Sequence, residues 1–510
     1  MADVVPRWEW RTFAHTASQA DTILDAMTPT SVEESDDLYL LTQDGDNVKI
    51  RDQLMDIKVL RETDSAGLQR WEPILKVPFP IDVEAAHTVF ASLRRACPEI
   101  PSDGLGLDAF MAAAQVGATD GPRAVAMHKR RARYTVGGCQ AERSTLASGG
   151  HQKTSIAVES TDPAAVAAAV AELGLGDYVN VDVPTGLRLL IDQVPERYAV
   201  IDAGTNSIKF HVAELDANGR GPWRTVVDRA VVTRLGEELE ATGEIGAKPL
   251  ERTVRVISEM ADEARLLDVQ GIAAVGTAGA RLARNRADLV ATVRARSGLA
   301  LEVISGEDEG RLAYLAVAAG VGLGDGAVVA FDTGGGSSQF TFGHGSSVDE
   351  RFSVPVGAVG FTERFGLAEA VPPGVVAEAM AAIAAELSLL DGRPPPDGIV
   401  AMGGAVTNLA AVKHGLATYD PDVVQGTVLD RAEIDRQIDR YRSIDAAGRR
   451  SIIGLQTARA EVILAGACIV RTIMDKLGRD SVTVSDHGLR HGLLIDRFGS
   501  GRRDPSPPQG

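Results

Sequence analysis

One pattern occurs twice in this chain: a short apolar strand that ends in Asp, a turn of small residues, and a second strand. The copies are YAVIDAGTNSIKF, residues 198–210, and VVAFDTGGGSSQFTF, residues 328–342. Each turn offers glycine backbone N–H groups and short polar side chains, which suit a phosphate group. One copy alone is more often a plain turn. Two copies predict two similar subdomains that face each other across a phosphate-binding cleft.

The doubled pattern resembles the actin-like ATPase superfamily (ASKHA, RNase H-like folds). The wording ID-x-G-T-N-S together with DTGGGSS resembles the family of Ppx/GppA exopolyphosphatases and guanosine pentaphosphate phosphohydrolases, over about residues 197–498. The resemblance implies an α/β fold with two actin-like subdomains, residues 197–322 and 323–498, and a central cleft. A tail at 499–510, rich in Gly, Pro and charge, is expected to be disordered.

In this family the two Asp residues hold Mg²⁺, so the resemblance implies Asp202 and Asp332 as metal ligands. The turns are expected to bind phosphate through Gly204, Thr205, Asn206, Ser207, Gly334, Gly335, Gly336, Ser337 and Ser338. The family continues G-G-G-S-T-E, whereas this chain has Gln339 at the Glu position. An amide is a poorer Mg²⁺ ligand than a carboxylate, which weakens the expected metal site.

Two further motifs point to phosphate chemistry. A strand at 272–275 leads into GTAGAR, and ligands collect at the carboxyl ends of strands in open α/β sheets, where Arg281 would suit a phosphate. The matching family motif T-x-A-x-R-x-A-x-N implies a phosphate-contacting role for Arg281. The segment SGEDEGR, residues 305–311, resembles I-S-G-x-E-E-x-R, whose last Glu, here Glu309, positions or deprotonates the attacking water. The acids there could equally be only helix-capping groups in a first turn.

The first 190 residues are expected to form a separate domain. Strand patterns carry alternating charges at Lys49, Arg51, Lys129, Arg131 and Arg133. These are either a solvated sheet face or, in a closed antiparallel sheet, a possible second anion site. The order of the pieces resembles the CYTH (triphosphate tunnel) family over about residues 5–180, which implies an α+β domain with an antiparallel β-tunnel.

The CYTH family begins with E-x-E-x-K, but this chain has Arg7-Trp8-Glu9-Trp10-Arg11, so Arg replaces the first metal-binding carboxylate. A tunnel without that acid should bind Mg²⁺ poorly and still attract phosphate oxygens. We therefore expect a degenerate anion-binding module in preference to a second catalyst.

Composition limits the remaining choices. The net charge of −18, from 52 basic and 70 acidic residues in 510, argues against general nucleic-acid binding. No apolar run is long enough for a membrane span, the N-terminus has no signal core, and the three cysteines lack metal or disulfide spacing. A cytoplasmic protein without membrane association is expected. The oligomeric state is open, with a homodimer as one candidate.

The sequence thus predicts a cytoplasmic, Mg²⁺-dependent hydrolase that releases terminal orthophosphate from inorganic polyphosphate or guanosine pentaphosphate. Both substrates present a linear anhydride, so the sequence does not choose between them. Two alternatives remain: a sensor that binds polyphosphate or the alarmone without turnover, and a phosphotransferase like the acetate and sugar kinases, suggested by residues 206–210.

Overall fold

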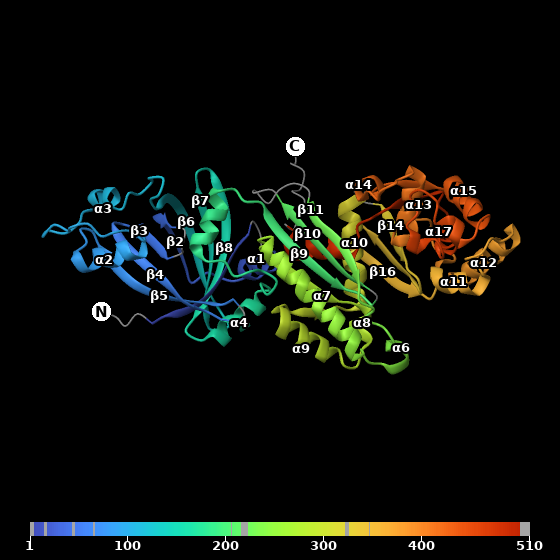
Figure 1. Ribbon diagram of the computed structural model, residues 1–510, viewed down its shortest axis with the longest axis horizontal. Coiled ribbons are helices and arrows are strands. Elements are labelled where there is room, and N and C mark those ends of the chain that lie inside the picture. The colour runs from blue at the N-terminus through green and yellow to red at the C-terminus, as the bar shows by residue number, and fades with distance from the viewer. Residues whose placement is uncertain are drawn as a thin grey trace. The chain divides into compact units, whose positions relative to one another are not determined.

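The computed structural model describes residues 5–14, 18–42, 46–64, 67–205, 207–215, 223–321, 326–345 and 347–499. Asn206 and residues 500–510 of the predicted tail lie outside this part of the chain. The described elements form two compact units (Figure 1). The first contains the described residues up to Val275, Leu282–Glu302 and those from Arg497; the second contains Gly276–Arg281 and Val303–Asp496.

The N-terminal part of the first unit is a closed barrel of eight antiparallel strands in the order β1-β5-β4-β3-β2-β6-β7-β8. It closes because β1 pairs with both β5 and β8. This barrel confirms the CYTH-like tunnel expected from the sequence. Its elements are β1 (Arg7–Ala14), α1 (Ser18–Asp25), β2 (Ser31–Leu41), β3 (Asn47–Arg51), β4 (Leu54–Thr63), β5 (Gln69–Pro78), α2 (Val83–Ser92), α3 (Leu107–Ala113), β6 (Arg123–Val136), β7 (Cys139–Ser148), β8 (His151–Ser160), α4 (Pro163–Glu172) and α5 (Val183–Ile191).

Helix α5 packs against one end of the barrel interior. Its Leu187 and Leu190 form a buried cluster with Phe13 and Met127, which lie on the same faces of β1 and β6 as the charged interior residues. Gly186 is required there, since a Cβ would lie 2.2 Å from the Phe13 ring. Asp182 caps this helix, which has Pro at its start, and the helix fills the barrel end.

The rest of the first unit is a five-stranded sheet in the order β11-β10-β9-β12-β13. Helix α7, with one buried face, packs on β9 and β10 and against α9 (Figure 1). The elements are β9 (Glu196–Ala203), β10 (Ser207–Leu215), β11 (Arg224–Val232), α6 (Leu239–Thr242), α7 (Ala247–Leu266), β12 (Gly271–Gly276), α9 (Arg286–Ser297) and β13 (Leu301–Val303). The short helix α8 (Ala278–Leu282) follows β12, and its residues up to Arg281 belong to the second unit.

The second unit has a six-stranded sheet in the order β16-β15-β14-β17-β19-β18, with a core centred on the apolar helix α17. Parallel pairing of β14 with β17 and of β17 with β19 fits an α/β fold. Its elements are α10 (Gly306–Val321), β14 (Ala327–Thr333), β15 (Ser338–His344), β16 (Ser347–Val354), α11 (Ala358–Phe365), α12 (Pro373–Glu386), η1 (Ser388–Leu390), β17 (Gly398–Met402), α13 (Gly404–His414), α14 (Pro421–Val424), β18 (Val428–Asp430), α15 (Arg431–Arg442), α16 (Ala446–Arg449), η2 (Thr457–Arg459), α17 (Ile463–Lys476), β19 (Ser481–Val484) and α18 (Leu489–Phe498). Among the described helices, none is both long and apolar enough to cross a bilayer.

Candidate active site

The first predicted hairpin is formed by β9 and β10. Asp202 is the penultimate residue of β9 and lies opposite Lys209, whose Nζ is 3.1 Å from Asp202 Oδ2. Asp202 is buried, and its Oδ1 has no hydrogen-bond partner. The Gly204 N–H is turned inward and donates to the Ser207 carbonyl at 3.1 Å. A buried carboxylate oxygen without a donor is chemically suited to a cation.

The second hairpin repeats this arrangement with β14 and β15. Asp332 is the penultimate residue of β14 and lies opposite Gln339, whose Nε2 donates to Ser337 Oγ at 2.9 Å. The turn closes through the Gly334 N–H and the Ser337 carbonyl at 2.9 Å. Ser338 differs from the expectation, because its hydroxyl is fully buried and donates to the Val356 carbonyl at 2.7 Å. That hydroxyl therefore holds the hairpin together and is not exposed to a ligand.

Asp332 lies directly against the start of helix α13. Gly403 has a φ of +91°, and a Cβ there would be 2.2 Å from Asp332 Oδ1. Only glycine combines this backbone angle with so close a carboxylate. The Asp332 carboxylate therefore has a fixed place at the carboxyl end of β14, which is where open α/β sheets bind ligands.

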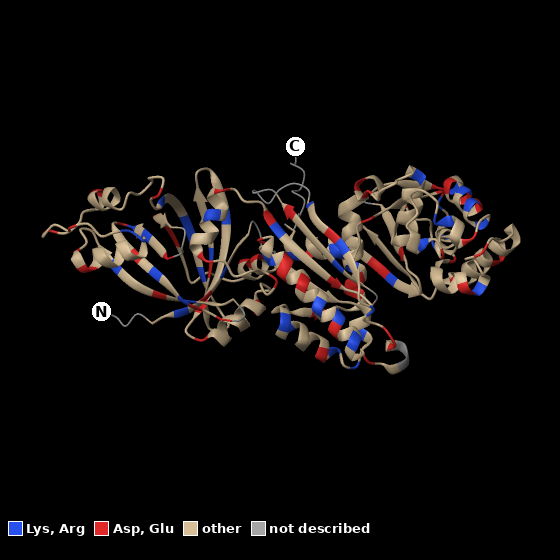
Figure 2. Ribbon diagram, viewed as in Figure 1, with Lys and Arg blue, Asp and Glu red and all other residues tan. Residues whose placement is uncertain are grey.

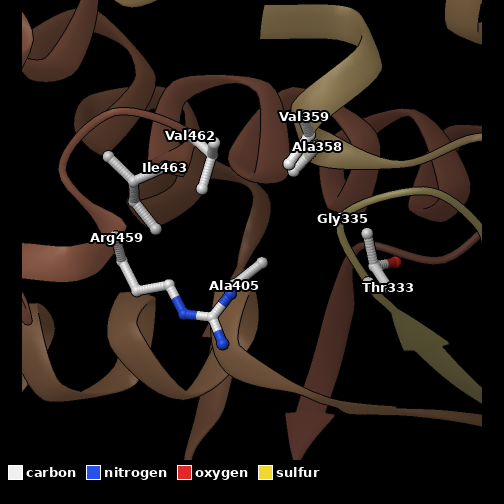
Figure 3. Close-up of a pocket in the computed structure, with 9 residues that line it drawn as sticks. Thr333, Gly335, Ala358, Val359, Ala405, Arg459, Val462 and Ile463 are labelled. Atoms are coloured by element: carbon white, nitrogen blue, oxygen red, sulfur yellow. The ribbon is translucent and has the colours of Figure 1, made fainter. Parts of the chain in front are cut away.

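A small pocket of about 30 Å³ lies beside the Gly-rich turn (Figure 3). Arg459 extends into it, close enough to α13 that a Cβ on Gly404 would be 2.6 Å from its guanidinium carbon. Within the described chain the Arg459 side chain forms no ion pair. Sequence reasoning missed this residue, because nothing in the local sequence shows that it reaches a turn more than a hundred residues earlier. The lining residues are Thr333, Gly334, Gly335, Ala358, Val359, Ala405, Arg459, Val462 and Ile463.

Arg281 and Glu309, which the sequence singled out separately, are in contact. Arg281 Nη1 lies 3.3 Å from Glu309 Oε2 and donates to the Ile304 carbonyl at 3.0 Å. Both side chains remain about one-third exposed, at 31% and 37%. Ser305 caps α10 as expected, since its Oγ accepts from the Asp308 N–H at 3.0 Å and donates to the Asp308 carboxylate. Capping thus accounts for Asp308 but leaves Glu309 turned toward an arginine.

The barrel encloses a second candidate site, a cavity of about 280 Å³. All five basic residues proposed from the sequence line it, and three further cations were missed. The barrel strands carry both basic and acidic segments (Figure 2). The cations are Arg11, Lys49, Arg51, Lys58, Lys76, Lys129, Arg131 and Arg133; the carboxylates are Glu9, Asp56, Glu142 and Glu159.

Each lining carboxylate has a cationic partner. Glu9 pairs with Arg11 at 2.8 Å, Asp56 with Lys49 at 3.3 Å, Glu142 with Lys129 at 2.7 Å, and Glu159 with Arg7 at 3.0 Å. Two more acids, Asp37 and Glu33, pair with Arg51, Arg131 and Arg133. Lys58 and Lys76 form no ion pair with any described residue. The lining therefore keeps a positive excess.

Burial sets the protonation of this cavity. Burial lowers the pKa of Lys129 to about 8, although Glu142 opposes that shift. Burial acts to raise the pKa of Glu142, but Lys129 and Arg11 bring it well below its usual value. The Nε atoms of Arg131 and Arg133 and the Asn47 Oδ1 are buried without hydrogen-bond partners. Buried polar atoms without hydrogen-bond partners are costly unless a ligand supplies the missing partner.

Known proteins are similar to the part of this chain that follows the barrel. The model of the Ppx/GppA phosphatase family matches residues 212–500. Exopolyphosphatase 2 of Mycobacterium tuberculosis is 27% identical over 320 residues, which cover 59% of this chain and 99% of that protein. Exopolyphosphatase 1 of Mycobacterium bovis is 28% identical over 311 residues, covering 60% and 89%.

A solved structure is similar over the same share of the chain. The crystal structure of the Aquifex aeolicus Ppx/GppA phosphatase (type II variant) is 34% identical with a TM-score of 0.56, and the match covers 59% of this chain and 99% of that one. The two α/β sheets with their Asp hairpins thus have a counterpart of known fold. The family model begins at residue 212, after the barrel and helix α5.

Proposed function

Because the chain belongs to the Ppx/GppA phosphatase family, we propose that it hydrolyses the terminal phosphoanhydride bond of inorganic polyphosphate and releases orthophosphate. Guanosine pentaphosphate, which presents the same kind of linear anhydride, is the alternative substrate. The observation that carries the proposal is the contact between Arg281 and Glu309 at the start of α10.

This contact suits both steps that hydrolysis requires. Glu309 can orient a water molecule and accept its proton, as a general base does. Arg281 can donate to phosphoryl oxygens while it keeps the Glu309 carboxylate in place, since a guanidinium has several N–H groups in one plane. Backbone N–H groups at the Gly-rich turns and the Arg459 guanidinium would add donors for the phosphate chain. Positioning and charge stabilisation do most of the work in phosphoryl transfer.

The carboxylates present suit Mg²⁺, which prefers hard oxygen ligands. Asp202 would supply its buried, unpartnered Oδ1, and Asp332 would supply a carboxylate oxygen at the carboxyl end of β14. A bound Mg²⁺ would neutralise phosphate oxygens. Lys209 already pairs with the other oxygen of Asp202 and would restrain that carboxylate.

The decisive test is phosphate release by Glu309→Gln on long polyphosphate, tripolyphosphate and guanosine pentaphosphate. We expect a rate loss of roughly 10²–10⁴, the usual contribution of a general base, with substrate affinity retained. Asp308→Asn is the matched control, because Asp308 is the neighbouring acid and bonds to the cap Ser305. Activity of Glu309→Gln within a few-fold of the parent would contradict the role proposed for Glu309. A kinase reaction would instead be detected as transfer of the phosphoryl group to an acceptor other than water.

We propose a second function for the barrel, binding of a linear phosphate anion without turnover. The positive lining and the unsatisfied arginine Nε atoms support it. Helix α5 at one end of the interior favours entry from the other, so a short chain or a chain end suits the cavity. Because the lining carboxylates are paired with cations, few carboxylate oxygens are available to bind a catalytic metal. Arg7, for example, forms an ion pair with Glu159.

Strand alternation provides a matched pair of variants for the barrel. Arg131 lines the cavity, whereas Arg130, next to it on β6, is exposed and pairs with Glu34. Arg131→Met should weaken tripolyphosphate binding at least about tenfold, the loss of one charge-assisted hydrogen bond, while Arg130→Met should not. Calorimetry in Glu309→Gln protein, with and without EDTA, separates this binding from hydrolysis. Equal affinities of the two variants would rule out the barrel cavity as the site.

A further inference from the structure

Arg351 on β16 reaches across to the first turn of helix α10, which packs beside that strand (Figure 1). Its Nη1 donates to the backbone carbonyl of Gly306, the first residue of the helix. The side chain is half-buried and forms no ion pair among the described residues. Arg351 lies outside both motifs that the sequence suggested for this region.

Two glycines make room for this side chain. A Cβ on Gly310 would lie 2.0 Å from Arg351 Cδ and 2.8 Å from its Nη1. Gly306 and Gly310 are one turn apart and therefore share a face of α10, along which the Arg351 side chain lies. Any larger residue at position 310 would displace the arginine.

The same glycines weaken the helix. Glycine favours a helix less than Ala does, and both glycines fall within the first five residues of α10. This first turn carries Glu309, which lies between Gly306 and Gly310 in the sequence. Without an external contact, the segment that presents Glu309 would be the part of α10 most prone to fraying.

Arg281 and Arg351 hold this turn together. A Cβ on Gly306 would lie 3.5 Å from Arg281 Nη2 and 3.6 Å from Arg351 Nη2. Arg281 contacts the Glu309 carboxylate and the Ile304 carbonyl, while Arg351 contacts the Gly306 carbonyl. The two guanidinium groups thus converge on the residue that starts the helix.

We propose that Arg351 is a positioning residue, which fixes the first turn of α10 so that Glu309 is presented in one orientation. This inference rests on the role proposed above for Glu309. Arg351 does not itself touch the reacting atoms. Its contribution is to the geometry of the carboxylate, and a displacement of about 1 Å at such a group can cost about a hundredfold in rate.

Two variants perturb the contact in opposite ways. Arg351→Met keeps aliphatic packing over Gly310 but removes the hydrogen bond and the charge. Gly310→Ala keeps the arginine but pushes it away, while it raises the intrinsic stability of the helix. If Arg351 were only a structural contact, Gly310→Ala would leave catalysis intact. We expect both variants to lower kcat by about 10- to 100-fold with KM within about threefold, and Arg351→Lys to recover part of the loss.

Arg393→Met is the matched control, because Arg393 forms a bidentate contact with Glu350, the neighbour of Arg351 on β16, and should leave kcat unchanged. In the Glu309→Gln background, Arg351→Met should cause little further loss, since both changes remove the same contribution. A rise in KM at constant kcat would overturn the proposal in favour of direct substrate contact, and an equal effect of Arg393→Met would assign the loss to β16 stability.

Hydrogen exchange gives a readout that does not depend on catalysis. Backbone amides of residues 306–311 should exchange about tenfold faster in Arg351→Met, with other helices unchanged, because local opening of that turn becomes easier. Unchanged exchange would refute the proposal even if activity fell. Faster exchange together with a fully active Glu309→Gln enzyme would support the contact between Arg351 and α10 but refute the role of Glu309.

Discussion

Replacing Gln339 by Glu tests whether the second Asp hairpin holds a metal ion. Gln339 lies directly opposite Asp332 in the antiparallel pair of β14 and β15. Directly opposite residues project from the same face, with Cβ atoms about 5 Å apart. Gln339 is exposed and its amide bonds only to Ser337 Oγ, so the substitution should be accommodated without repacking.

The size of the effect follows from this geometry. Two carboxylates about 5 Å apart repel by about 3 kcal/mol at an effective dielectric constant of 20 and by less than about 1 kcal/mol in water. Because Gln339 is exposed, we expect the lower part of that range, about 1 kcal/mol. In a domain of about 200 residues, this lowers the thermal midpoint by about 2–4 °C when no metal is present. A bound Mg²⁺ reverses the sign, since tenfold excess over its Kd returns about 1.4 kcal/mol.

The assay compares thermal unfolding of the parent and Gln339→Glu in EDTA and across a Mg²⁺ titration, with phosphate release measured in parallel. We expect a lower midpoint in EDTA, recovery with Mg²⁺, and half-maximal activity at a lower Mg²⁺ concentration. An identical Mg²⁺ response of the two proteins would mean that this side chain does not reach a metal. Lost activity in a folded variant would mean that the Gln339 amide acts by orienting Ser337.

Two further predictions concern stability. Arg449 is fully buried and donates to the carbonyls of Tyr441, Leu367, Ala460 and Glu369, so Arg449→Met should destabilise the protein by more than about 3 kcal/mol, measured as a loss of thermal midpoint or of soluble protein. Burial raises the pKa of Asp177 to about 6, so the folded state holds this proton more tightly and stability falls as pH rises from about 4 to about 6. Asp177→Asn should therefore raise the midpoint at pH 7.5 and leave it unchanged at pH 4; a gain at both pH values would exclude ionisation as the cause.

The local parts of the site could be predicted from sequence, because each is determined by neighbouring residues. Strand alternation and a turn of small residues specify a hairpin over about a dozen positions. Both predicted hairpins, β9–β10 and β14–β15, are present in the structure. The barrel interior follows the same rule, since period-two alternation placed Lys129, Arg131 and Arg133 on one face, and closure turned that face inward.

Contacts between distant segments could not be predicted in this way. Arg459 reaches the Gly-rich turn only through the packing of α13 and η2, and Arg351 reaches α10 only because β16 lies beside it. In both cases the sequence contains one signal, a glycine whose absent Cβ leaves room for the arginine. This glycine is Gly404 for Arg459 and Gly310 for Arg351. A glycine inside a helix is a weak signal by itself, because it does not identify the side chain that needs the space.

The barrel and the first Asp hairpin cannot be treated as independent pieces. Strand β9 carries Asp202 near its end and begins at Glu196, which forms an ion pair with Lys153 of barrel strand β8 at 2.8 Å, each side chain 2% exposed. Tyr198 donates to the same carboxylate and stacks on Phe498, which also contacts Tyr178.

Removing residues 1–190 would take away Lys153 and Tyr178, and would expose the faces of Tyr198 and Phe498 that Tyr178 contacts, at the base of the strand that carries Asp202. Each ring buries about 150–250 Å², so exposing even half of two of them costs about 4–6 kcal/mol at 25 cal/mol per Å². That is a large share of the stability of an ordinary domain. A fragment that lacks the barrel would lose activity for this reason alone, and its inactivity would say nothing about anion binding in the cavity. Single substitutions such as Arg131→Met in the full chain avoid this ambiguity, because they change the cavity while the contact between Lys153 and Glu196 stays in place.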